Sequence, residues 1–405
     1  MVARLGSMAR GNGAASLPPA MAALTPLPLP DMLAIAARNM APAYLRRRIA
    51  RAGAPYTVDG TTTFAYVGDA ESVDVVHFMA RFPEFPSMER VEDSDLWHVT
   101  VALPPGSRVE YKLEVVGTDR TDRILDPLNR RTASDPFGSN SVAHAPGHVE
   151  PSWVNPNGGA PGTLEAFEIE KSAFGDRRLV SVYLPPGFPD DGPYPPVVLH
   201  DGSDMVEYAS LATVLDNLIG TGAVRPAVVA LLDPVHRSEE YTASETHGRF
   251  VVDDVLPRLA TGFHTTDDPA LRVIGGSSLG AVASLATAWY HPGTFGSTIL
   301  LSGSFVTATG GPMRRGPLFE PVIAFMKAFT ENPGQPSDRV WMAVGTFEGL
   351  VADNRAFRIV LEATGMAVHY EEVADGHHWQ SWRNLLGGAL LDLLPAGLPA
   401  GAAAQ

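Results

Sequence analysis

The pattern of hydrophobic and polar positions divides the chain into regions of different texture. Short β-type runs separated by turn residues fill about residues 56–144, and nearly continuous apolar runs alternate with helix-period segments after residue 163. Short strands at such spacing are typical of an antiparallel sandwich, and strand–helix alternation is typical of a parallel sheet covered by helices. The pattern therefore predicts an α/β fold with a mostly parallel sheet, preceded by an immunoglobulin-like β-sandwich.

Individual elements follow from the same pattern. In the first region we expect strands at 62–66, 73–78, 97–103 and 109–116. In the second we expect strands at 179–184, 197–200, 227–232, 272–275, 297–301, 340–344 and 368–373. Helices are expected between them, near 207–219, 246–260, 279–290, 318–330, 352–364 and 380–394.

The flanking segments complete the predicted organisation. Residues 1–30 are rich in Ala, Gly and Pro, and 31–51 has helical spacing, with Asp31 as a candidate N-cap and Pro42 as a kink. Residues 151–159 have the composition of a linker. We expect an N-terminal extension over 1–52, a β-domain over 53–150, a linker over 151–164 and a catalytic domain over 165–398.

Composition narrows the classes of function. Lys and Arg number 30 against 45 Asp and Glu, a net charge of −15, which disfavours binding to nucleic acid. No apolar run reaches the ~18–20 residues that span a bilayer, and the first 30 residues lack the apolar core of a signal peptide. The chain has no cysteine, which excludes thiolate chemistry and fits a reducing compartment. We expect a cytoplasmic protein that binds no membrane.

One motif predicts a nucleophile. Gly276, Ser278 and Gly280 form a Gly-x-Ser-x-Gly pattern between a predicted strand and a predicted helix. In this setting a serine is held on a tight turn with its hydroxyl exposed above the sheet, and small neighbours allow the close backbone packing. The register of the pattern selects Ser278 over the adjacent Ser277.

A serine needs a base and an acid, which follow it in the order Ser, acid, His. His377 comes directly after Gly376, in the turn before the last predicted helix, and is favoured over His378. Glu348 follows the penultimate predicted strand and is favoured as the acid over Asp353, which we expect to cap the next helix. His369 alternates with apolar neighbours and is expected to be packed.

An oxyanion hole needs two backbone N–H groups. Leu279, directly after the nucleophile, is one candidate donor. The other is Gly202 or Ser203, in the loop after the predicted strand 197–200. This chemistry requires no cofactor and no metal site.

Several segments together carry a resemblance to a known family. They are Val-Val-Leu-His-Asp-Gly (197–202), His-Arg-Ser-Glu-Glu-Tyr (236–241), Gly-Gly-Ser-Ser-Leu-Gly-Ala (275–281) and Asp-Gly-His-His-Trp-Gln-Ser-Trp-Arg (375–383). Over most of 165–395 the chain resembles the enterochelin (enterobactin) esterases, within the esterase D-type α/β-hydrolases. The segment before it is similar to the early-set β-domains of these esterases.

The resemblance implies a serine esterase that cuts the ester backbone of an iron-loaded siderophore, with iron arriving as part of the substrate. It supports the triad Ser278, His377 and Glu348. It also implies contacts between the substrate and Arg237, Arg383 and Trp382, with a surface ion pair to Glu240 as the alternative role of Arg237; Arg314 and Arg315 are further candidates for a basic patch. His378 departs from the acidic residue that the family usually has after its catalytic histidine.

Other functions remain open at this stage. Related hydrolases act on feruloylated or acetylated sugars, and the same acyl-enzyme would serve an acyltransferase. A third possibility is a glycan-binding protein with an inert hydrolase domain, in which Trp97 stacks on a sugar. In an esterase, we expect the β-domain to pack beside the active site and to restrict what enters. The oligomeric state stays open.

Overall fold

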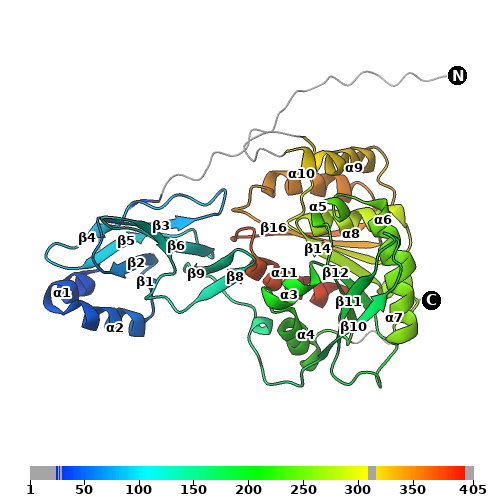
Figure 1. Ribbon diagram of the computed structural model, residues 1–405, viewed down its shortest axis with the longest axis horizontal. Helices are drawn as coiled ribbons and strands as arrows, with labels where there is room; N and C mark the ends of the chain where they lie inside the picture. Colours follow the sequence, from blue (N-terminus) through cyan, green and yellow to red (C-terminus); the bar gives the residue numbers. More distant parts are fainter. Residues whose placement is uncertain (1–23, 26, 28–29, 309–315, 397–405) are drawn as a thin grey trace, which may run out of the picture.

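The computed structural model describes residues 24–25, 27, 30–308 and 316–396. Two helices and two antiparallel sheets come first, followed by a large sheet between two layers of helices (Figure 1). No described helix has both the length and the apolar character needed to cross a membrane.

The N-terminal region contains two sheets that face each other. Its strands are β1 (Tyr56–Val58), β2 (Thr61–Val67), β3 (Ser72–His77), β4 (Glu89–Arg90), β5 (Leu96–Val101), β6 (Arg108–Val116), β7 (Thr121–Ile124), β8 (Thr132–Asp135) and β9 (Gly138–His144). One sheet has the order β1-β2-β5-β4, and the other has the order β3-β6-β9-β8, with β7 paired to β6. Phe64 and Val99 of the first sheet share a buried cluster with Val73 and Leu113 of the second, so the core lies between the sheets.

Two helices, α1 (Asp31–Asn39) and α2 (Pro42–Ala52), cover the first of these sheets. Leu45 and Ile49 of α2 are buried in one cluster with Val67 of β2. Pro42 occupies the first turn of α2, where its missing N–H costs no hydrogen bond. The single kinked helix predicted from the sequence is therefore two helices, and Pro30, not Asp31, precedes the first one.

The second region is built on one eight-stranded sheet. Its strands are β10 (Thr163–Ile169), β11 (Arg178–Leu184), β12 (Pro196–His200), β13 (Val228–Leu232), β14 (Val273–Ser277), β15 (Ser297–Leu301), β16 (Arg339–Gly345) and β17 (Ala367–Val373). Their order is β10-β11-β13-β12-β14-β15-β16-β17, with antiparallel pairing at β10–β11 and β11–β13 and parallel pairing elsewhere.

Helices cover both faces of this sheet. They are α3 (Gly202–Glu207), α4 (Leu211–Gly220), α5 (Arg237–Glu240), α6 (Glu245–Arg249), α7 (Leu256–Gly262), α8 (Leu279–Tyr290), α9 (Glu320–Glu331), α10 (Val351–Glu362) and α11 (Trp379–Leu393). Phe250–Val255 forms π-helical turns between α6 and α7, and three short 3-10 turns lie at Ser152–Val154, Pro269–Leu271 and Pro317–Phe319.

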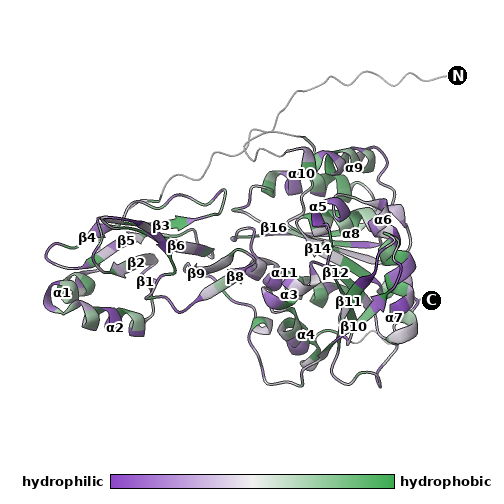
Figure 2. Ribbon diagram, viewed as in Figure 1, coloured by the Kyte–Doolittle hydropathy of each residue, from purple (hydrophilic) through white to green (hydrophobic). Residues whose placement is uncertain are grey.

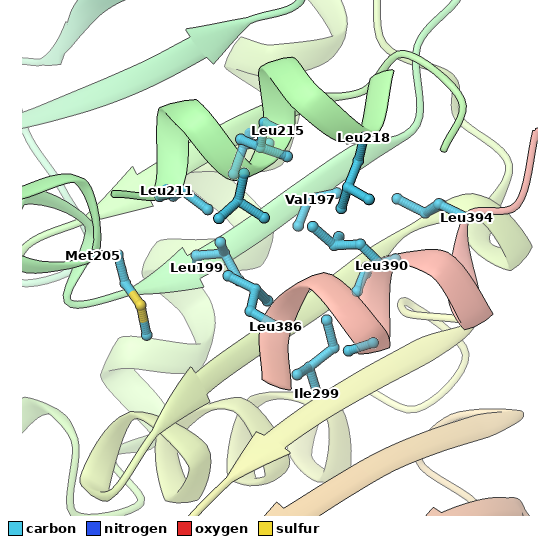
Figure 3. Close-up of a cluster of buried hydrophobic side chains, with 14 of the residues drawn as sticks. Val197, Leu199, Met205, Leu211, Leu215, Leu218, Ile299, Leu386, Leu390 and Leu394 are labelled. Carbon is cyan, nitrogen blue, oxygen red and sulfur yellow. The ribbon is translucent and has the colours of Figure 1, made fainter. Parts of the chain in front are cut away.

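Alternation along the strands sends neighbouring side chains to opposite layers. Leu199 and Ile299 pack with Leu215 of α4 and Leu386 of α11 (Figure 3). Leu300, the neighbour of Ile299, belongs instead to the cluster that includes α8, α9 and α10.

The outer helices are amphipathic, as their position requires. Figure 2 shows hydrophobic and hydrophilic residues in α7 and α10. The buried residues of α10 are Val351, Asn354, Phe357 and Leu361, which recur at intervals of three and four and therefore lie on one face.

The sequence predicted most of the central sheet and missed several outer elements. Strand 297–301 and helix 279–290 have the predicted bounds. The predicted helix 246–260 is divided among α6, the π-helical turns and α7. In the expected linker, Trp153 packs against the cluster of α4 and α11. The mostly parallel sheet covered by helices, which the alternating pattern predicts, is present.

Candidate active site

Ser278 occupies a sharp turn between β14 and α8. Its backbone has φ 57° and ψ −118°, a region that side-chain-bearing residues rarely adopt, and its N–H donates to the Leu301 carbonyl at 2.9 Å. A Cβ atom at Gly276 would lie 2.7 Å from the Gly280 backbone, so glycine is needed there for the close packing. Ser277 is fully buried, whereas Ser278 lines a cavity.

Glu348 and His377 meet at the same cavity. Glu348 is 1% exposed and lies three residues beyond the end of β16; its Oε2 accepts from His377 Nδ1 at 2.7 Å. Its Oε1 accepts from the Gly345 N–H at 2.8 Å and from Ser302 Oγ at 2.6 Å. Three donors therefore fix this carboxylate, and the imidazole is fixed through it.

The alternative acid and bases lie in other positions. Asp353 is in the first turn of α10, and Leu350 precedes that helix, so the expected capping role of Asp353 is wrong. His378 lines the cavity, and its Nδ1 lies 3.7 Å from Glu110 Oε2. Burial lowers the pKa of His378. His369 is 48% exposed on the edge strand β17 and stacks on Trp341, so the expectation that it is packed in the interior is wrong.

The cavity has a volume of about 910 Å³ and is lined by both regions of the protein. Its aromatic lining is Phe78, Phe137, Phe319, Phe347, Trp379 and Trp382. Phe137, at the tip of the β8–β9 hairpin, is 96% exposed, and Phe78 is 65% exposed. Of the Lys and Arg residues that the structure describes, Lys112 and Arg237 line it.

The candidate oxyanion donors lie at the N-termini of two helices. Leu279 is the first residue of α8, directly after Ser278, and Gly202 and Ser203 open α3 after β12. The Ser203 N–H donates to Asp233 Oδ1 at 2.9 Å. A Cβ at Gly202 would lie 2.4 Å from the Leu231 side chain, so only glycine fits there without a shift.

The two arginines predicted to contact substrate, Arg237 and Arg383, have different surroundings. Arg237 lines the cavity and pairs with Asp201 through both its Nε (2.7 Å) and Nη2 (2.8 Å), not with Glu240. Glu240 instead accepts from Arg178, so the alternative ion pair expected for Arg237 is wrong. Arg383 is buried, donates to Glu150 and lies outside the cavity lining.

Trp382 lines the cavity, and its ring packs edge to face on that of His377 with centroids 4.8 Å apart. Its Nε1 donates to Ser302 Oγ at 3.0 Å. Ser302 thus connects Trp382 with Glu348, a role that the sequence analysis missed. Its position directly after β15 was the available signal, because carboxyl ends of parallel strands gather at one edge of the sheet.

Two further expectations concern other parts of the chain. Trp97 is 7% exposed, and its Nε1 donates to the Gly68 carbonyl, so it is a core residue and the proposed sugar stacking is wrong. Arg314 and Arg315 lie outside the described residues. Among the residues that are described, no cluster of three or more His, Asp or Glu has a metal-binding arrangement.

The chain is similar in sequence to a family of esterases and to iron(III) enterobactin esterases. Residues 171–393 match the model of a family described as putative esterase. The chain is 25% identical to the iron(III) enterobactin esterase of Dickeya dadantii, over 76% of this chain and 78% of that protein. It is 24% identical to the iron(III) enterobactin esterase of Escherichia coli K12, over 76% of this chain and 81% of that protein.

Solved structures agree in fold. The enterobactin esterase of Shigella flexneri, crystallised in the presence of enterobactin, superposes with a TM-score of 0.68 at 22% identity, over 82% of this chain and 92% of that chain. The ferric enterobactin esterase of Salmonella typhimurium gives a TM-score of 0.68 at 21% identity, over 83% and 94%. The family match covers more than half of the chain and confirms the resemblance predicted from the sequence: the chain belongs to the putative esterase family and is a carboxylic-ester hydrolase.

Proposed function

We propose that this carboxylic-ester hydrolase is a serine esterase with Ser278 as nucleophile, His377 as general base and Glu348 as the orienting acid. One observation carries the proposal: the strained turn presents Ser278 to the same cavity in which His377 donates to the buried Glu348. A serine hydroxyl needs such a base, and the base needs a carboxylate to hold its tautomer.

The reaction follows from these roles. Ser278 Oγ attacks the ester carbonyl carbon while His377 Nε2 accepts the hydroxyl proton, and Glu348 stabilises the imidazolium through the Nδ1–H bond. The tetrahedral intermediate expels the alcohol, which takes the proton from His377. Water then attacks the acyl-enzyme by the same route and releases the acid.

The negative oxygen of the intermediate needs two N–H donors. We propose the N–H groups of Leu279 and Gly202. Ser203 is the weaker candidate because Asp233 already accepts its N–H. The sequence leaves the second donor open between Gly202 and Ser203, and we propose Gly202.

For the substrate, we propose an ester with aromatic groups, such as a siderophore of the enterobactin type. The curated relatives are iron(III) enterobactin esterases, and the cavity is rich in aromatic side chains that can stack on catechol rings. Arg237 is already paired with Asp201, which leaves Lys112 as the described cavity-lining cation best placed to meet an anionic ligand.

The organisation of the chain is part of this proposal. We propose an early-set, immunoglobulin-like β-sandwich over 53–150 and a catalytic domain over 165–398, joined by 151–164. Side chains of both N-terminal sheets share one core, which supports the sandwich. We propose a cytoplasmic location, which the absence of cysteine supports.

Labelling with a fluorophosphonate probe tests the function. The wild type should be labelled and should hydrolyse p-nitrophenyl acetate and butyrate, and Ser278→Ala should abolish both. Ser277→Ala is the matched control, because its hydroxyl is buried next to the nucleophile and has no hydrogen-bond partner among the described residues. An unlabelled, folded wild type would refute the serine mechanism.

Substrate assays then separate the candidate esters. Ferric enterobactin should be cleaved faster than feruloylated sugars if the proposed substrate class is right. Adding an alcohol acceptor and analysing the products distinguishes hydrolysis from acyl transfer, since a transferase would yield the new ester in place of the free acid.

A further inference from the structure

The N-terminal region contacts both loops that carry the proposed acid and base, through the segment after β3 and through the start of β6. The Arg81 N–H donates to the Phe347 carbonyl at 3.1 Å, and Phe82 packs edge to face on Phe347 with ring centroids 4.9 Å apart. The Arg108 N–H donates to the Ala374 carbonyl at 3.1 Å. Phe347 directly precedes Glu348, and Ala374 lies three residues before His377, so the contacts are made beside the reacting groups.

The side chain of Arg108 makes the strongest of these links. It starts β6, is fully buried and forms a two-point interaction with Asp375: Nε donates to Oδ2 at 2.7 Å and Nη2 donates to Oδ1 at 3.1 Å. Nη1 donates to Glu110 Oε1 at 2.8 Å and to Gln380 Oε1 at 3.0 Å. The planar guanidinium thus joins a strand of the first region to the loop before α11.

Asp375 also binds the backbone next to both proposed catalytic residues. Its Oδ1 accepts from the Gly376 N–H at 2.7 Å, next to His377 in the chain. Its carbonyl accepts from the Phe347 N–H at 3.1 Å, next to Glu348. The side chain and the carbonyl of Asp375 therefore hold the backbone directly before His377 and directly before Glu348.

The charges of this cluster are arranged to keep Arg108 in place. Burial alone would raise the pKa of Glu110, but Arg108, with His378, holds it below the usual value, so Glu110 is a carboxylate. Arg108 thus pairs with the buried carboxylates of Glu110 and Asp375. Moving the guanidinium away would leave both carboxylates buried without a partner, which costs free energy. None of the hydrogen bonds that Arg108 makes involves the side chain of Ser278, His377 or Glu348.

We propose that Arg108, acting through Asp375, is a positioning residue for His377 and Glu348, so that the N-terminal region completes the geometry of the active site. This inference rests on the proposed triad and extends it. The sequence predicts a β-domain that restricts substrate entry; positioning the triad adds a role in turnover itself. A misplacement of about 1 Å costs a rate of the order of 100-fold, so loss of the link should lower turnover.

Two substitutions test the link with little change in side-chain volume. Arg108→Lys keeps the positive charge and loses the two-point geometry, and Asp375→Asn keeps the shape and the acceptor for the Gly376 N–H. In each we expect kcat for p-nitrophenyl butyrate to fall about 10- to 100-fold, with KM changed less than about twofold, and phosphonylation of Ser278 by a fluorophosphonate to slow in parallel. The double variant should be no slower than the slower single variant, because both remove one shared interaction.

Tyr111→Phe is the matched control. Tyr111 lies on the same strand and is fully buried, and its hydroxyl donates to Asp126 Oδ2 at 2.6 Å and accepts from Asn129, both in the N-terminal region. Its loss should lower Tm and leave kcat within about twofold of the wild type.

The outcomes separate the two proposals. An unlabelled wild type would refute the serine mechanism itself. A normally labelled wild type, with kcat preserved in folded Arg108→Lys and Asp375→Asn, would overturn the positioning role alone. So would an equal loss of kcat in Tyr111→Phe, because that would reflect general loosening of the N-terminal region. If Arg108→Lys fails to fold, Asp375→Asn decides the question.

Discussion

Glu348 and His377 are joined by a 2.7 Å hydrogen bond from Nδ1 of the imidazole to Oε2 of the carboxylate. Because two further donors hold the other oxygen of Glu348, the direction of this bond is fixed by the protein before any ligand binds. His377 Nε2 is then the nitrogen left for proton transfer.

Glu348→Gln should lower kcat by about 10²- to 10⁴-fold with little change in fold. The amide keeps the shape of the side chain but no longer enforces the Nδ1–H tautomer, the effect that makes the equivalent change severe in other triads. Steady-state kinetics with p-nitrophenyl butyrate measure it. Asp353→Asn, in the first turn of α10, is the control and should keep the wild-type kcat.

Ser302→Ala should have a smaller effect on both turnover and stability. It removes the 2.6 Å bond to Glu348 and leaves the buried Trp382 Nε1 without its acceptor. We expect a loss of about 1–3 kcal/mol in the free energy of unfolding and a fall in kcat of roughly tenfold, which corresponds to about 1.4 kcal/mol. Urea unfolding and kinetics on one preparation give both numbers. An unchanged kcat would show that the Gly345 N–H and His377 suffice to hold the carboxylate.

Phe137→Ala should change substrate preference and leave stability intact. Its ring is 96% exposed and lines the cavity from the β8–β9 hairpin, so the folded state loses almost no burial. We expect KM to rise for aromatic esters, with kcat/KM for p-nitrophenyl acetate reduced much less. Ile359→Ala, an exposed apolar residue that lies outside the cavity lining, should alter neither.

Acid should destabilise the protein through a buried histidine pair. His200 Nε2 and His247 Nε2 lie 2.8 Å apart, and burial lowers the pKa of His200 from 6.5 to about 4 and that of His247 well below its usual value. The unfolded chain therefore binds more protons than the folded one in this range, and stability falls as the pH drops from 6.5 towards 4.

For His200 alone the loss is on the order of 3 kcal/mol by pH 4 and about 2 kcal/mol between pH 7 and pH 5, because each pH unit below 6.5 costs about 1.4 kcal/mol until the folded pKa is reached. Urea unfolding at pH 7 and at pH 5 measures the slope. His247→Gln keeps a donor for His200 and removes one of the two titrating groups, so its slope should be shallower than that of the wild type. Equal slopes would show that other groups dominate acid unfolding.

The buried strands and the turn that carries Ser278 could be predicted from the sequence, because each depends on residues close together in the chain. The apolar runs of β12 to β16 are buried on both faces, and Gly276 and Gly280 mark a turn whose close packing the structure shows directly. β10 was missed because its residues are mostly exposed, which weakens the apolar signal of an edge strand. A tryptophan in a strand does not by itself reveal which face it occupies, so the sequence leaves open a sugar-stacking role for Trp97 that its burial rules out.

Ion pairs between residues far apart in the sequence could not be predicted from local patterns. Arg237 has Glu240 one helical turn away in sequence, yet its partner is Asp201, on a loop that the sheet brings beside it. The Arg108–Asp375 pair joins positions 267 apart, and neither segment carries a local motif that announces the other. Sequence patterns give the side chains with the right chemistry, and the topology of the sheet decides which of them meet.

The contact of Arg108 with Asp375 also constrains how this protein can be recombined. A chimera that grafts the N-terminal sheets onto another hydrolase of the family must supply a carboxylate at the position of Asp375, or the buried guanidinium of Arg108 will keep Glu110 and lose its two-point partner beside the catalytic loop. The two regions are therefore not interchangeable modules, and libraries that exchange them should vary residues 108 and 375 as one unit.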